Sequence, residues 1–102
     1  MEVHLFSSDL EKFILSLEKP IIAKIIRTID LLEQFENNLG MPHSKKVAKQ
    51  LFELRIHGAQ EVRIFYTFRK NSIILLCGFV KKTKRIPQKE IKIALQRLTS
   101  LA

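Results

Sequence analysis

The chain has 102 residues, 46% of them hydrophobic, which is enough for a single domain over residues 1–102 with one core. Its one cysteine, Cys77, lies in an apolar run, so the sequence excludes a disulfide framework and a cluster of thiol ligands. No signal-peptide pattern is present, and no apolar run reaches the roughly 20 residues that span a bilayer. We therefore expect a cytoplasmic protein without membrane contact.

The net charge of +8 is distributed unevenly along the chain. Residues 1–42 carry four lysines and arginines against seven acidic residues, a net −3, whereas residues 43–102 carry fourteen against three, a net +11. A cationic half of this size favours a polyanionic partner, because each phosphate it neutralises releases condensed counterions. A surface that merely keeps the protein soluble is the alternative, and we favour nucleic acid.

The first part of the chain predicts a short strand and two helices. Val3–Phe6 has β-favouring side chains, and Ser8 with Glu11 forms a capping-box pattern at the start of a helix. Pro20 suits the first turn of a second, longer helix, whose apolar residues recur at helical spacing until Gly40. The two helices are expected to form a hairpin.

The middle of the chain predicts three strands. The basic segment His43–Gln50 has no strong period and is expected to be a loop or a short helix. Leu51–His57 alternates apolar and polar residues, which favours a half-buried strand. Val62–Arg69 and Ser72–Val80 are rich in β-branched and aromatic residues, and a two-residue connection between them predicts a central hairpin.

A two-residue hairpin loop predicts which residues face each other across these strands. It puts Arg63 on the face turned away from the helices. The expected pairs are Arg69 with Ser72, Thr67 with Ile74, Phe65 with Leu76 and Arg63 with Gly78. The more apolar face should receive the helices and comprises Ile64, Tyr66, Phe68, Ile73, Leu75, Cys77 and Phe79.

Whether Arg55 shares the face of Arg63 depends on the loop after His57. A loop of three or five residues puts both arginines on one face, and a loop of four separates them. The sequence leaves both arrangements open. Glu53 alternates in phase with Arg55, and we expect it to pair with that arginine as a structural group.

The last segment predicts a C-terminal helix that begins near Pro87. Its basic residues lie on a different face from its apolar stripe. The stripe comprises Ile91, Ala94, Leu95, Leu98 and Leu101. The element order is then β-α-α-β-β-β-α, an α+β fold with a small, mainly antiparallel sheet, an N-terminal helical hairpin and a C-terminal helix.

With these elements, the sequence resembles the RelE/HigB-like toxins of bacterial type II toxin-antitoxin pairs, particularly their phage-associated branch. The stretches that carry the resemblance are Leu51–Arg55 (LFELR), Val62–Tyr66 (VRIFY), Gly78–Pro87 (GFVKKTKRIP), and Glu90, Ile91 and Ala94. The resemblance implies a RelE-like fold and a ribosome-dependent mRNA endonuclease that inhibits translation. It also implies a cognate antitoxin, typically a helix-turn-helix DNA-binding protein.

The resemblance further implies basic catalytic residues: Arg63 in the middle of the sheet, with Lys81, Lys82 and Lys84 after the last strand. Metal-free RNA cleavage uses the substrate's own 2′-OH against the adjacent phosphate, so the protein supplies orientation, charge and proton transfer. Arg63 could hold a phosphate and the lysines could stabilise the developing charge. His57 is a possible general acid or base. We expect no metal and no other cofactor.

Other basic residues are expected to contact RNA or the ribosome. They are Arg55, Lys45, Lys46, Lys49, Arg69, Arg85, Lys89 and Lys92. The chain also departs from the founding RelE pattern, because Leu51 and Glu53 stand where that pattern has lysines and no tyrosine follows Lys84. Two alternative functions stay open: a ParE-like toxin that inhibits gyrase, and a basic RNA-binding module without catalysis.

Overall fold

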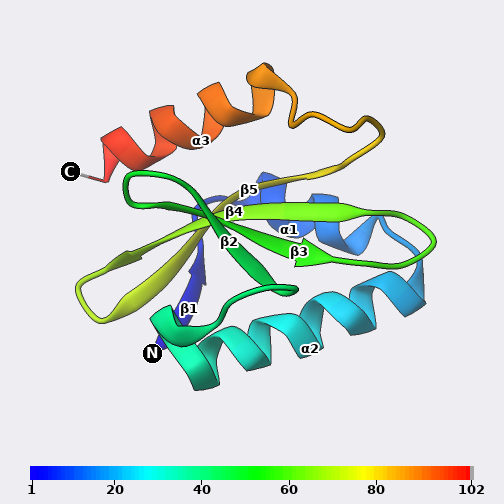
Figure 1. Ribbon diagram of the computed structural model, residues 1–102, viewed down its shortest axis with the longest axis horizontal. Helices are drawn as coiled ribbons and strands as arrows, with labels where there is room; N and C mark the ends of the chain where they lie inside the picture. The colour runs from blue at the N-terminus through cyan, green and yellow to red at the C-terminus, as the bar shows by residue number, and fades with distance from the viewer. Residues whose placement is uncertain (102) are drawn as a thin grey trace.

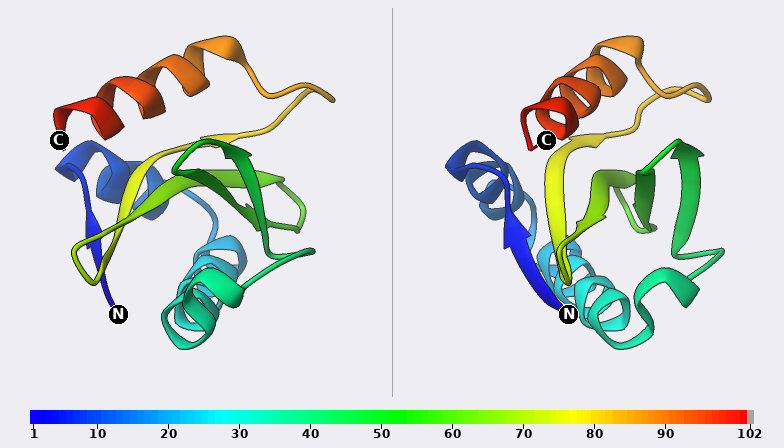
Figure 2. Two further views of the ribbon diagram at one scale, coloured as in Figure 1. Left: turned by 60° about the vertical axis from the view of Figure 1, so that its left-hand side comes forward. Right: turned by 90° about the vertical axis from the view of Figure 1, so that its left-hand side faces the viewer.

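The computed structural model describes residues 1–101 and has the predicted α+β fold, with one five-stranded sheet between helices (Figure 1). The strand order is β1-β5-β4-β3-β2, and only β1 runs parallel to its neighbour in the part described. Helices α1 and α2 lie on one side of the sheet and α3 on the other (Figure 2). The elements are β1 (Glu2–Leu5), α1 (Ser8–Leu15), α2 (Lys19–Phe35), a 3₁₀ turn η1 (Glu36–Asn38), β2 (Ser44–Ala48), β3 (Leu51–Ile56), β4 (Val62–Arg69), β5 (Ser72–Val80) and α3 (Gln88–Ser100).

Both N-terminal helices form where the sequence predicts them. Pro20 stands in the first turn of α2, where its missing N–H would have had no partner in the helix. The capping box predicted at Ser8 is wrong, because Ser7 is the N-cap and makes no capping hydrogen bond through its side chain. The Ser7 hydroxyl instead donates to the carboxylate of Asp9.

The prediction of a loop or short helix for His43–Gln50 is wrong, because this segment contains β2. β2 pairs antiparallel with β3, with a register shift between Lys46 and Ala48. It is an edge strand, and lysines on edge strands oppose pairing with other chains. The same lysines removed the apolar alternation by which a strand is recognised in a sequence.

The predicted hairpin between β4 and β5 is confirmed, but its register is right only near the turn. Lys70 and Asn71 have φ of 48° and 62°, as a two-residue turn of type I′ requires. The pairs Arg69 with Ser72 and Thr67 with Ile74 are found as predicted. Beyond them a bulge shifts the ladder by one residue.

The bulge leaves Leu76 without a partner on β4, so Phe65 pairs with Cys77 and Arg63 with Phe79. The predicted pairs with Leu76 and Gly78 are therefore wrong. Cys77 and Phe79 consequently pack on the α3 side of the sheet instead of beneath α1 and α2. The carbonyl of Leu76 accepts a hydrogen bond of 2.6 Å from Arg97 of α3, which gives the extra residue a polar partner.

The core has two layers, one on each side of the sheet. The larger layer joins α1 and α2 to β3, β4 and β5 around Leu32, Leu54 and Tyr66. The smaller layer lies under α3 and includes Phe65 and Phe79. In α3 the stripe is confirmed except at Leu95, which is 40% exposed; its remaining members Ile91, Ala94, Leu98 and Leu101 belong to the smaller layer.

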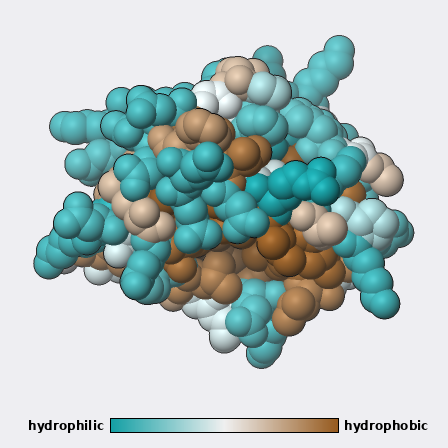
Figure 3. Space-filling model, turned by 90° about the horizontal axis from the view of Figure 1, so that it is seen from below, coloured by the Kyte–Doolittle hydropathy of each residue, from teal (hydrophilic) through white to brown (hydrophobic). Residues whose placement is uncertain are grey.

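The outer surface on the α2 side combines apolar and charged groups. Seen from below Figure 1, apolar atoms gather in the middle of this face with hydrophilic ones around them (Figure 3). α2 itself exposes Ile26 and Phe35, at 55% and 47%. Within residues 1–101, no helix combines the length and apolar character needed to cross a membrane.

Candidate active site at the loop end of the sheet

Two loops meet at one end of the sheet, on the right of Figure 1. One is the β3–β4 turn, residues 57–61, and the other is the segment that follows β5, residues 81–87. The backbone N–H of Lys81 donates to the carbonyl of Glu61 over 2.7 Å, which holds the start of the second loop against the first. We call this region, formed by Glu53, Arg55, His57, Glu61, Arg63 and residues 81–85, the loop end.

The five-residue turn settles the position of Arg55. Ile56 pairs with Val62, and Arg55 stands directly opposite Arg63 on the same face. Glu53 lies one pleat further along, and its Oε1 is 3.4 Å from Nε of Arg55 and 3.5 Å from Nε of Arg63. The predicted structural pairing of Glu53 with Arg55 is confirmed, and the carboxylate is shared by both arginines.

Arg63 is buried within this network. The residue is 2% exposed, its NH1 donates to the carbonyl of Val62 over 3.2 Å, and its NH2 is 3.8 Å from Glu61. The charges of Arg55 and Arg63 are thus offset by those of Glu53 and Glu61. As arranged here, Arg63 has neither the exposure nor the free charge for direct contact with a phosphate, so its expected catalytic role stays a prediction.

His57 is fixed by the other carboxylate of the network. Its Nδ1 is 2.9 Å from Oε1 of Glu61, while Oε2 of Glu61 accepts a 3.3 Å hydrogen bond from the N–H of Gly58. The hydrogen bond from His57 is the main cause that lowers the pKa of Glu61 below its ordinary value. An ionised carboxylate only accepts, so Nδ1 carries the hydrogen and Nε2 is the nitrogen available to a ligand.

A cavity of about 200 Å³ adjoins the loop end between α2 and β3. Arg55 and His57 line it together with three further basic groups, Lys24, Arg27 and His43. Lys24 is anchored by a 2.9 Å hydrogen bond from its Nζ to the carbonyl of His57. Sequence reasoning did not include Lys24 or Arg27, because their polar positions on a helix do not reveal which strand end they meet.

The remaining predicted basic residues separate into groups. Lys81 is half-buried at the loop end, whereas Lys82, Lys84 and Arg85 are exposed beside it. Lys45 is exposed and pairs across the strands with Glu53, so it lies on the same face as the network. Five residues lie elsewhere: Lys46 and Lys49 near the β2–β3 turn, Arg69 at the β4–β5 hairpin, and the exposed Lys89 and Lys92 on α3.

Other chemically reactive groups are remote from a catalytic arrangement. Cys77 is buried, as expected for a core residue, and burial raises the pKa of its thiol to about 11. Within the described residues, no three His, Cys, Asp or Glu side chains come together in a way that could hold a metal ion. The loop end is therefore a site made of basic side chains and two supporting carboxylates.

The fold and this site define a class: a small α+β protein of RelE-like architecture, with its C-terminal helix across a mostly antiparallel sheet. Among families, the one described as phage-derived protein Gp49-like (DUF891) matches residues 12–99. The chain therefore belongs to the Gp49-like family, which is known as a branch of the RelE/HigB-like toxins. None of the curated proteins matches the chain.

Proposed function

We propose that the protein is the toxin of a type II toxin-antitoxin pair and cuts mRNA on the ribosome without a metal. The observation that carries the proposal is the loop end, where His57 and the lysines of residues 81–84 come from two loops joined by the bond between Lys81 and Glu61. Membership of the Gp49-like family supports the same reading. The partners of this function are the ribosome, its mRNA and a cognate antitoxin, which we expect to be a helix-turn-helix DNA-binding protein.

The cleavage step needs a proton removed from the 2′-OH and another delivered to the leaving 5′ oxygen. In our proposal Nε2 of His57 serves one of these transfers, while Glu61 fixes the ring. Lys81, Lys82 and Lys84 stabilise the charge that grows on the phosphate oxygens. The 2′-OH attacks phosphorus, the bond to the 5′ oxygen breaks, and a cyclic phosphate and a free 5′-OH result.

Arg63 takes a supporting role in this proposal. Its guanidinium lies between Glu53 and Glu61, so it holds the carboxylate that in turn orients His57. We therefore treat it as a positioning residue whose removal affects the fold as well as the activity. The exposed lysines provide the cleaner test of the site.

The test is inducible expression followed by growth measurement and sequencing of RNA 5′ ends. We expect growth arrest with new mRNA ends for the unchanged protein. Lys82→Ala and His57→Gln should each reduce mRNA cutting by at least about tenfold, which corresponds to about 1.4 kcal/mol of lost transition-state stabilisation. Lys12→Ala, at an exposed lysine of α1, is the matched control and should cut as before.

Other outcomes distinguish the alternatives. Broken DNA without new RNA ends would favour gyrase inhibition, and salt-sensitive RNA binding without arrest would favour a non-catalytic module. Full cutting by both Lys82→Ala and His57→Gln would overturn the assignment of the loop end. Rescue of growth by an adjacent gene product would identify the antitoxin.

A further inference from the structure

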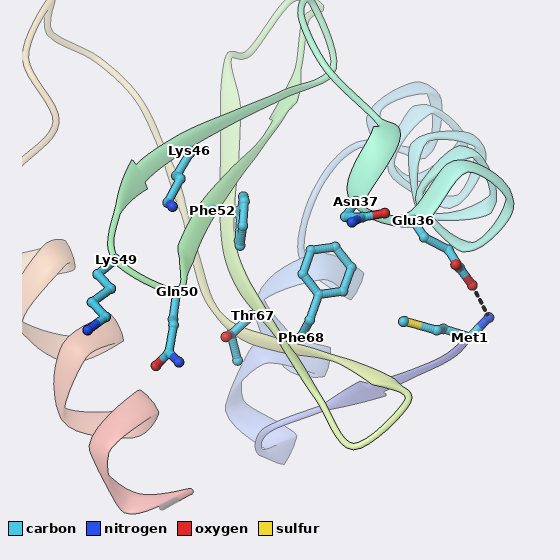
Figure 4. A pocket seen from close by; sticks show the side chains of 9 residues that line it. All are labelled: Met1, Glu36, Asn37, Lys46, Lys49, Gln50, Phe52, Thr67 and Phe68. Carbon is cyan, nitrogen blue, oxygen red and sulfur yellow. Dashed lines mark hydrogen bonds and ion pairs between the residues drawn. The ribbon is translucent and has the colours of Figure 1, made fainter.

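A second, larger cavity lies at the opposite end of the sheet from His57. It measures about 700 Å³ and opens beside the β2–β3 turn (Figure 4). We call it the turn pocket. Its lining residues are Met1, Glu36, Asn37, Lys46, Lys49, Gln50, Phe52, Thr67 and Phe68. The volume is within the usual range for sites that bind small molecules.

The floor of the turn pocket is aromatic. Phe52 and Phe68 are both only partly buried, and their rings meet edge to face with centroids 5.3 Å apart. Phe52 also stacks on Tyr66, at 5.4 Å and 22° between planes, which holds its ring in place. Tyr66 is itself fixed by a hydrogen bond to Ser44. The pocket thus offers a preformed apolar surface suited to a flat ring.

The rim of the turn pocket is cationic beside the β2–β3 turn, while its one carboxylate, Glu36, is paired with the N-terminal amine of Met1 at 3.1 Å. Lys46 and Lys49 are exposed, and neither makes an ion pair within residues 1–101. Figure 4 shows Lys46 above Phe52 and Lys49 beside Gln50. Gln50 has a φ of 61° in the tight turn, and its amide offers both a donor and an acceptor. Such a rim fits a ligand with a phosphate.

We propose that the turn pocket binds one nucleotide of single-stranded RNA, with the base against Phe52 and Phe68 and its phosphate beside Lys46 and Lys49. Stacking on aromatic side chains adds affinity for each base and tolerates any base. The inference rests on the proposed function only in taking RNA as the ligand. Because the 8 residues of β4 run between the two sites, the bound nucleotide lies several positions along the strand from the one that is cut.

The test uses nuclear magnetic resonance of the ¹⁵N-labelled protein with a 2′-O-methylated pentanucleotide, which has no free 2′-OH for cleavage. We expect backbone signals of residues 46–52 and 67–68 to shift on titration. An abasic oligomer with the same backbone should bind at least about fivefold more weakly, the effect of losing about 1 kcal/mol of stacking. Lys49→Ala and Phe68→Leu should weaken binding, and Lys12→Ala should not.

Three outcomes would overturn the inference. Equal affinity for the intact and abasic oligomers would leave only phosphate contact, and shifts confined to the loop end would leave the turn pocket without a ligand. Shifts at the turn pocket with the antitoxin but none with the oligomer would assign it to a protein partner. Because binding is measured without cleavage, failure here is separate from failure of mRNA cutting in cells.

Discussion

The shared carboxylate of Glu53 should be the most sensitive position of the loop end. Its side chain is 4% exposed and faces two guanidinium groups, one of which, that of Arg63, is 3% exposed. Glu53→Leu leaves Arg63 buried with only Glu61 at 3.8 Å. Removing one partner of a buried ion pair costs about 3–5 kcal/mol, because the remaining charge stays desolvated. This is a large part of the roughly 5–15 kcal/mol that stabilises a domain.

A double-mutant cycle tests this reasoning. Glu53→Leu should lower the free energy of unfolding most, and Arg63→Met should lower it less, because Glu53 then retains Arg55 at 3.4 Å. The double variant should lose much less than the sum of the two single losses, since an apolar pair can replace a buried ion pair at little cost. Urea unfolding followed by circular dichroism gives the three values; with a slope of roughly 2 kcal/mol per M, a loss of about 4 kcal/mol moves the midpoint by about 2 M.

Two results would refute the view that Glu53 and Arg63 form a buried, coupled ion pair. A loss below about 1 kcal/mol for Glu53→Leu would mean that the pair behaves as a solvated surface bridge. Strict additivity in the double variant would mean that the two side chains act independently. Either result would also restore Arg63 as a group free to hold a phosphate, as the resemblance implies.

Three further predictions concern single residues. Cys77 should resist iodoacetamide at pH 8 in the folded protein and react in urea, because it is buried and its raised pKa of about 11 keeps it a thiol. Because of the same pKa shift, the contribution of Cys77 to stability is present below pH 9 and is lost as the pH rises toward 11. Arg97→Ala should lower the free energy of unfolding by about 1.5–3 kcal/mol in urea titrations, since the Leu76 carbonyl loses a charged donor. In the same assay, the unchanged protein should be more stable than Glu61→Gln by under about 1 kcal/mol, because the Glu61 side chain is 40% exposed. This difference should be complete above pH 4.5 and should disappear as the pH falls through the lowered pKa of Glu61.

The fold was predictable because its helices and central strands have strong local patterns. Three features were not. β2 has lysines where alternation would mark a strand, since an edge strand has no apolar layer to cover its outer residues. At the bulge, the carbonyl of Leu76 accepts a hydrogen bond from Arg97, which lies 21 residues later in the sequence. Once the bulge is missed, every pair beyond it moves to the wrong face, because strand side chains alternate with a period of two.

The candidate site was predictable in its residue types but only partly in its geometry. The resemblance indicated Arg63 and the lysines after the last strand as site residues, and their catalytic roles stay a prediction. Burial of Arg63 could not be read from the sequence, because it follows from Glu53 and Glu61 standing on either side of it. Glu61 itself carried no signal, since an acidic residue in a turn is ordinary.

The departure from the founding RelE pattern now has a physical account. Leu51 and Glu53 stand where that pattern has lysines, and they are 0% and 3% exposed, so strand β3 offers no cation of its own at these positions. Glu53 offsets the arginines on its face, which leaves the exposed positive charge to the segments around it. Lys45, directly across from Glu53 on β2, and Lys82 after β5 supply that charge from opposite sides. In the proposed function, a phosphate drawn to this face would be held from its margins, above a floor whose arginines are offset by Glu53 and Glu61.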